Sequence, residues 1–232
     1  MPRVFDYILM ETKLDELWPG GPRYRRFDGV FPLSSDTAWL GAFVRPGRAV
    51  TVCDLGCGGG ALSLQLLGRK PALRVSALDI LPAAAEAAAY NAALNGFEMD
   101  VRCGDLRDWR SFFTPGSFDL VVSNPPYGKR SGPAAAGSRG IARQENCSPA
   151  ELCAAAAGLV RQRGKFCLVY PPERLGELIC AMTEAGLEPK RLRLVHKDAS
   201  GAPCAVLLEG VKGGGKGLSI LPPLFTEEGI TP

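Results

Sequence analysis

The chain has 232 residues, of which 46% are hydrophobic and 22% charged, and its formal net charge is +3. This length and apolar content suit one globular domain with a full core. The sequence has no apolar run of about eighteen residues and no signal-peptide pattern, so we expect a soluble, cytoplasmic protein rather than a membrane-spanning or secreted one. The charge is too small to prove a nucleic-acid partner by itself.

Cysteine and histidine usage argues against a metal site. The eight cysteines show no Cys-x-x-Cys spacing, and His196 is the single histidine. This pattern favours reduced, mostly buried thiols in an intracellular protein. We therefore expect no metal and a structural role for His196.

Residues 1–30 are expected to form an N-terminal extension ahead of one domain over residues 31–232. Arg23, Arg25 and Arg26 bracket Tyr24 in this stretch. Such a basic cluster could contact phosphates, but taken alone it is more typical of a solvated surface.

A glycine loop joins the predicted strand Val50–Cys53 to a helix that begins after Gly60. Gly56 and Gly58 allow positive φ and a close ligand approach, which makes this loop a cofactor cradle. The spacing G-x-G-x-G departs from the dinucleotide fingerprint and disfavours a pyrophosphate. Asp54 would repel phosphates but suits the ammonium of an amino-acid moiety, unless it is only a turn or capping aspartate.

Two further predicted strands end in aspartates. Leu73–Asp79 precedes a helix that starts at Pro82, and a strand through Val101 leads to Asp105. An acid at the end of the second strand suits ribose hydroxyls. Asp105 can accept a hydrogen bond from the exocyclic amine of adenine. Either acid alone could be a solvated loop residue, but together with Asp54 they line one edge of a parallel sheet.

The sequence Asn-Pro-Pro-Tyr (an NPPY motif) at residues 124–127 follows the predicted strand Phe118–Ser123. Its prolines cannot continue a strand, so the chain leaves the sheet here. The side-chain oxygen of Asn124 and nearby main-chain carbonyls would then face the crevice at this edge of the sheet. The ring of Tyr127 could stack against a planar ligand there. This pocket suits a planar NH2 group, although an isolated motif of this kind can also be an ordinary strand-ending turn.

The remaining elements complete an α/β sheet. A capping box at Ser148-Pro149-Ala150-Glu151 predicts a helix over 152–163 that Gly164 stops. The other predicted elements are the strand Phe166–Tyr170, a helix over 173–185 and a closing pair of strands, Leu192–Val195 and Ala205–Leu208.

As a set, these motifs resemble the class I S-adenosylmethionine-dependent methyltransferases that methylate amino groups. The resemblance implies a Rossmann-like, seven-stranded α/β sheet over residues 31–232, mostly parallel with an antiparallel last strand and helices on both faces. It implies S-adenosylmethionine as the cofactor, with Asp79 at its ribose and Asp105 at its adenine. The implied cofactor site comprises Asp54, Gly56, Gly58, Asp79, Ile80, Asp105, Leu106 and Asn124, and the implied catalytic residues are Asn124, Pro125 and Tyr127.

Segments 31–40, 141–145 and 170–175 further resemble the small-domain branch that methylates N6 of adenine 37 in valine tRNA. This implies structured RNA, in the first place a tRNA, as the partner. The implied substrate contacts are Asp36, Lys129, Arg139 and Arg143.

Three alternative functions remain open. Protein-glutamine methyltransferases normally carry a separate helical substrate domain before the glycine loop, for which too few residues precede Asp54. Ribosomal-RNA guanine methyltransferases share a similar Asn-Pro-Pro motif and are the closest rival. A cofactor-binding scaffold without activity is the non-enzyme alternative.

Overall fold

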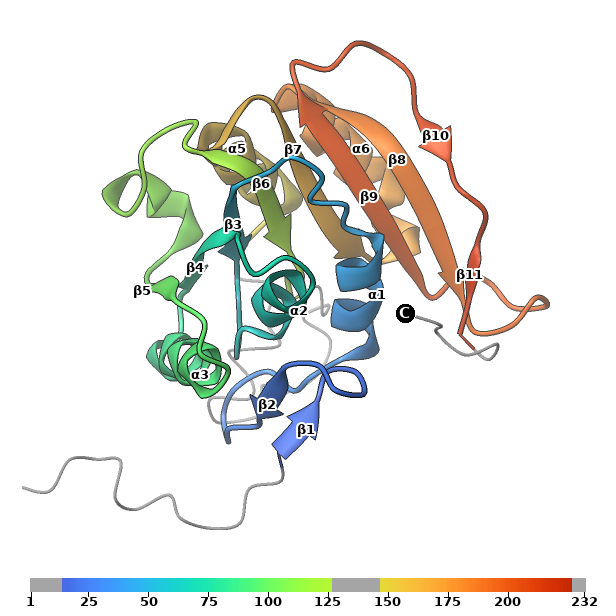
Figure 1. Ribbon diagram of the computed structural model, residues 1–232. Helices are drawn as coiled ribbons and strands as arrows, with labels where there is room; N and C mark the ends of the chain where they lie inside the picture. Colours follow the sequence, from blue (N-terminus) through green and yellow to red (C-terminus); the bar gives the residue numbers. More distant parts are fainter. Residues whose placement is uncertain (1–13, 127–146, 227–232) are drawn as a thin grey trace, which may run out of the picture.

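A single mixed sheet forms the centre of the molecule in the computed structural model, which describes residues 14–126 and 147–226 (Figure 1). Its seven long strands run in the order β8-β9-β7-β6-β3-β4-β5. Only β9 is antiparallel to its neighbours, β7 and β8. The predicted α/β class and the antiparallel last strand are therefore confirmed. The bounds are β3 Thr51–Leu55, β4 Arg74–Asp79, β5 Met99–Cys103, β6 Phe118–Ser123, β7 Val160–Tyr170, β8 Leu187–His196 and β9 Ala205–Lys212.

Two short strands from the tail extend this sheet beyond β8. β10 (Ser219–Ile220) and β11 (Leu224–Phe225) both pair with β8 in parallel. The seven predicted strands are therefore all present, and the two tail strands extend them to a nine-stranded sheet within the described residues. Without the tail, the outer edge of β8 would leave its backbone N–H and C=O groups unpaired. Pro222 and Pro223 lie between β10 and β11, and because proline has no N–H to donate, they interrupt the pairing of the tail with β8.

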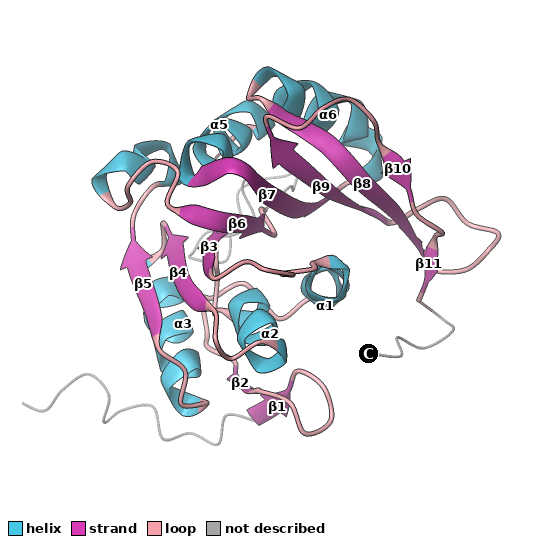
Figure 2. Cartoon of the chain, turned by 45° about the horizontal axis from the view of Figure 1, so that its top comes forward, coloured by secondary structure: helices cyan, strands magenta, loops and turns pink. Residues whose placement is uncertain are grey.

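Helices cover both faces of the sheet, as predicted (Figure 2). One face carries α1 (Ser35–Phe43), α2 (Ala61–Arg69) and α3 (Pro82–Leu94), and the other carries α5 (Pro149–Leu159) and α6 (Leu175–Glu184). Short 3-10 segments span Leu106–Ser111 and Pro172–Arg174. Each face has its own apolar cluster, one around Leu40 and Leu66 and the other around Leu159 and Met182. No helix in the described part of the chain is long and apolar enough to cross a membrane.

Helix α5 ends four residues earlier than its predicted end at residue 163. The capping box is confirmed, because Ser148 N donates to Glu151 Oε2 (2.8 Å) and Glu151 N donates to Ser148 Oγ (3.2 Å). Val160 already belongs to β7, where it pairs with Phe118. A register shift follows, and Arg163 takes a φ of 66°. Pairing with β6 thus overrides the helical pattern, and the glycine after Arg163 belongs to a strand irregularity rather than a helix end.

An N-terminal hairpin, β1 (Leu14–Glu16) and β2 (Arg23–Arg25), lies beside α2 and α3 (Figure 1). Asn95 accepts from Arg23 N and donates to Arg23 O, both at 2.7 Å. Asn91 accepts from Arg25 N (2.9 Å) and donates to Arg25 O (3.1 Å). The two asparagine side chains thus pair with the backbone N–H and C=O groups of β2, as a neighbouring strand would. The division of the chain at residue 30 stays a prediction, but this part of the extension packs on the sheet's helices.

Candidate active site

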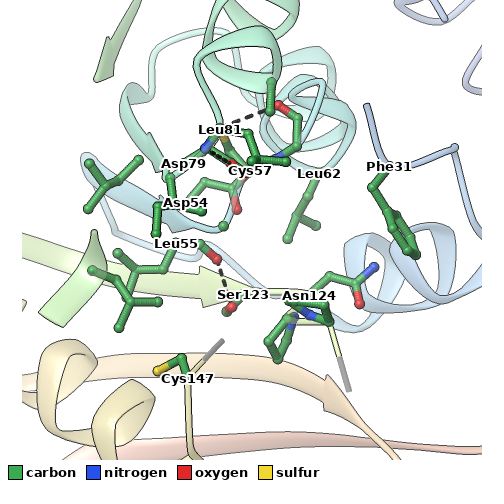
Figure 3. A pocket seen from close by; sticks show the side chains of 18 of the residues that line it. Phe31, Asp54, Leu55, Cys57, Leu62, Asp79, Leu81, Ser123, Asn124 and Cys147 are labelled. Carbon is green, nitrogen blue, oxygen red and sulfur yellow. Dashed lines mark hydrogen bonds between the residues drawn. The ribbon is translucent and has the colours of Figure 1, made fainter. Parts of the chain in front are cut away.

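A cavity opens at the carboxyl ends of β3 and β6, where the strand order reverses direction (Figure 3). Open α/β sheets bind ligands at this switch point. Tyr127, Lys129, Arg139 and Arg143 lie outside the described residues. The other predicted cofactor and catalytic residues all line this cavity: Asp54, Gly56, Gly58, Asp79, Ile80, Asp105, Leu106, Asn124 and Pro125.

The glycine loop is fixed to the neighbouring strand. Gly56 N donates to Leu78 O (2.8 Å). Gly56 and Gly58 have φ values of 72° and 53°, which side-chain-bearing residues rarely adopt. At Gly60 a Cβ would lie 3.2 Å from Ala88, so this glycine also lets α2 start close to α3. The loop therefore presents a preformed backbone surface to the cavity.

Asp54 lies at the floor of the cavity with only 1% of its surface exposed. Its Oδ2 accepts a hydrogen bond from Ser63 Oγ at 2.7 Å. Burial raises the pKa of Asp54 to about 7, the Ser63 hydrogen bond opposes this shift, and the negative charge of Asp79 adds to it. A buried carboxyl of this kind favours the arrival of a cation, such as an ammonium group.

Asp54 should make the ligand-free protein less stable as pH rises. Its folded-state pKa is raised, so stability is fully present below about pH 4 and is lost progressively up to pH 7. Between pH 5 and 7 we expect a loss on the order of 2 kcal/mol in the free energy of unfolding. Urea titrations of the protein and of Asp54→Asn at several pH values measure it. Equal pH slopes for the two proteins would contradict this assignment.

Asp79 is held by the backbone around it. Its Oδ2 accepts from Gly58 N (2.8 Å) and its Oδ1 accepts from Leu81 N (3.0 Å). Burial raises the pKa of Asp79, and these backbone hydrogen bonds oppose the rise. Each carboxylate oxygen keeps lone pairs for further donors, so the fixed group suits two neighbouring hydroxyls.

Asp105 already has a partner in the structure. Its carboxylate accepts from the Arg107 guanidinium and from Arg107 N (2.8 Å). The Arg107 hydrogen bond lowers the pKa of Asp105. The predicted adenine contact therefore has to share this carboxylate with Arg107. Ile80, 45% exposed, and Leu106 supply an apolar wall beside it for a planar ring.

Asn124 is oriented by the start of α1. Its Nδ2 donates to Thr37 Oγ1 (2.9 Å) and more weakly to Ser34 Oγ (3.4 Å). The two hydroxyls thus occupy the amide's donor end, and Oδ1 remains as the acceptor. Ser34 also caps α1, since its Oγ accepts from Thr37 N. Sequence analysis missed both hydroxyls, although Ser34-x-x-Thr37 before an apolar run is a helix-start signal.

Other side chains complete the cavity wall. Tyr24 comes from β2. Phe31, 39% exposed, comes from the segment before α1 (Figure 3). Asp36 lies in the first turn of α1 but does not line the cavity, so its substrate contact stays a prediction. No group of three metal-binding side chains occurs within residues 14–126 and 147–226.

This strand order, with a glycine loop and acidic strand ends at the switch point, defines an α/β fold of the class I methyltransferase kind. Residues 37–172 match the model of the methyltransferase small domain family, and the chain belongs to that family.

Two named relatives of this chain are also methyltransferases. A Porphyromonas gingivalis protein is 32% identical over 200 residues, covering 80% of this chain and 78% of its own. A Cronobacter sakazakii protein is 32% identical over 183 residues, covering 76% and 73%. Both are named tRNA1(Val) (adenine(37)-N6)-methyltransferase.

Solved structures share the fold. A predicted O-methyltransferase from Agrobacterium tumefaciens superposes with a TM-score of 0.65 at 22% identity, covering 82% of this chain and 86% of its own. The Thermus thermophilus 16S rRNA N2 G1207 methyltransferase, in complex with AdoMet and guanosine, gives 0.58 at 18% identity, covering 87% and 50%. At these identities the comparison concerns architecture alone.

Proposed function

We propose that this protein transfers a methyl group from S-adenosylmethionine to the exocyclic N6 amine of an adenine in tRNA, in the cytoplasm. The observation that carries the proposal is the orientation of Asn124, whose amide oxygen is left as an acceptor beside Pro125. The names of the relatives support adenine 37 of valine tRNA as the target. They do not favour ribosomal guanine or protein glutamine.

The cavity fits the cofactor by its polarity. Asp54 suits the ammonium of the amino-acid part, and Asp79, held by Gly58 N and Leu81 N, suits the ribose hydroxyls. Ile80 and Leu106 suit the two faces of adenine. When bound, S-adenosylmethionine supplies an electrophilic methyl carbon on a sulfonium.

The target amine is a poor nucleophile, because its lone pair is delocalised into the purine ring. Asn124 Oδ1 and the Pro125 carbonyl would accept its two hydrogens best as the nitrogen becomes pyramidal. They would therefore stabilise the transition state more than the ground state. Neither group takes a proton permanently, so the proton that the product nitrogen loses passes to solvent. The phenol ring at position 127, in the NPPY motif, would stack on the base.

Mapping of the transferred label tests this function. The protein is incubated with methyl-labelled S-adenosylmethionine and, separately, total tRNA, ribosomal RNA and protein from a strain that lacks it. We expect N6-methyladenosine in the nuclease digest of tRNA. Label in N2-methylguanosine of ribosomal RNA, or in polypeptide, would refute the proposal.

Thr37→Val should reduce catalysis without weakening cofactor binding. Valine has nearly the same shape but cannot accept the 2.9 Å hydrogen bond from Asn124 Nδ2. Without this bond, the Asn124 amide is no longer held with its oxygen toward the substrate. We therefore expect kcat to fall roughly tenfold or more. Thr37→Ser keeps the hydroxyl and should stay within about twofold of the parent. Equal kcat values for the valine and serine variants would contradict this role.

A further inference from the structure

The side chain of Tyr24 is buried in the cavity wall, and its hydroxyl is a donor that faces the cavity. Tyr24 is 3% exposed and lines the cavity. Within residues 14–126 and 147–226, no hydrogen bond joins its hydroxyl to another residue. A Cβ built on Gly59 would lie 2.2 Å from the hydroxyl oxygen, so the phenol rests against the glycine loop. A hydroxyl in a cavity wall that has no partner in the protein is available as a donor to a bound ligand.

The start of α2 adds further donors on the same side of the cavity. Ala61 and Leu62, the first two residues of this nine-residue helix, line the cavity, and the N-cap Gly60 provides no side-chain cap. Backbone N–H groups at a helix start attract an anion. The Tyr24 hydroxyl and this helix start therefore suit a carboxylate, while Asp54 suits the ammonium of the same amino-acid moiety.

The fold holds Tyr24 in this place through a shared anchor. Asn91 is fully buried, and its Nδ2 donates both to Arg25 O (3.1 Å) and to Gly59 O (3.0 Å). One side chain thus links β2 to the glycine loop, with the Tyr24 phenol between them. Burial raises the pKa of Tyr24 to about 12, so the hydroxyl keeps its proton at neutral pH.

We propose that the Tyr24 hydroxyl donates a hydrogen bond to the α-carboxylate of S-adenosylmethionine, together with the backbone N–H groups at the start of α2. Strand β2, which sequence analysis assigned to an extension outside the domain, is then a wall of the cofactor site. The inference rests on the proposed function only in its choice of cofactor.

Calorimetric titration of Tyr24→Phe tests the inference. Phenylalanine fills the same space without the donor, so we expect the dissociation constant for S-adenosylmethionine to rise about tenfold or more. Decarboxylated S-adenosylmethionine should bind the variant and the unaltered protein equally well. Tyr90→Phe is the matched control, because the Tyr90 hydroxyl on α3 accepts from Arg25 Nη1 outside the cavity. Its affinity for both ligands should not change.

Two results would overturn the inference. An unchanged affinity of Tyr24→Phe for S-adenosylmethionine would show that its hydroxyl makes no such contact. An equal loss for the decarboxylated compound would mean that the substitution disturbs the cavity generally. Failure of the unaltered protein to bind S-adenosylmethionine would refute the proposed function itself, and this inference with it.

Discussion

Asn124→Ala is expected to lower kcat by about 10²–10³-fold, the usual cost of removing one preorganised group from a transition-state site. Alanine leaves the Pro125 carbonyl as the remaining acceptor for a target amine that needs two. The ends of β6 and β3 should stay together, since Ser123 Oγ still donates to Leu55 O (2.7 Å). Single-turnover rates with saturating cofactor and tRNA measure the effect on chemistry directly.

Cofactor binding is the control for this variant. The hydrogen bonds of Asn124 that the structure describes lead to Ser34 and Thr37 rather than to the glycine loop. The dissociation constant for S-adenosylmethionine should therefore remain within about twofold of the parent value. A near-normal rate for Asn124→Ala would remove the central role of this residue, even if methylation of tRNA were observed.

Local sequence patterns were sufficient for the centre of this site, because each of its acids lies at or just after the carboxyl end of a predicted strand. Asp54, Asp79 and Asp105 reach one cavity once the strands are parallel neighbours. The partners of these groups were not predictable in the same way. Thr37 and Asn124 are 87 positions apart, and no local pattern fixes which hydroxyl meets the amide.

In the N-terminal stretch, the sequence pattern predicted only part of the arrangement. Arg23 and Arg26 are exposed, as a solvated cluster predicts, whereas the Arg25 guanidinium lies 5.6 Å and 5.4 Å from the ring centres of Phe27 and Tyr90. Alternation along Arg23-Tyr24-Arg25 was the available signal for a strand with its tyrosine turned inward. The strand is only three residues long, and asparagines from α3 pair with it, so its sequence alone could not reveal its place.

Asp79→Ala should weaken cofactor binding more than any other substitution discussed. Two hydrogen bonds from ribose hydroxyls to a carboxylate are each worth about 1.5–3 kcal/mol, so the dissociation constant should rise roughly 100-fold or more. The loss has a second source, because Gly58 N and Leu81 N lose the acceptor that fixes the glycine loop. Asp79→Asn keeps one acceptor oxygen and should fall between alanine and the parent.

Calorimetry with S-adenosylhomocysteine measures this effect, and Asp100→Ala provides the matched control. Asp100 lies on the neighbouring strand β5, outside the cavity, in an exposed pair with Arg102. An exposed pair of this kind contributes little, so the affinity of Asp100→Ala should equal that of the parent. If Asp79→Ala binds as tightly as Asp100→Ala, the carboxylate at the end of β4 does not hold the ribose, and the cofactor must lie in the cavity in another orientation.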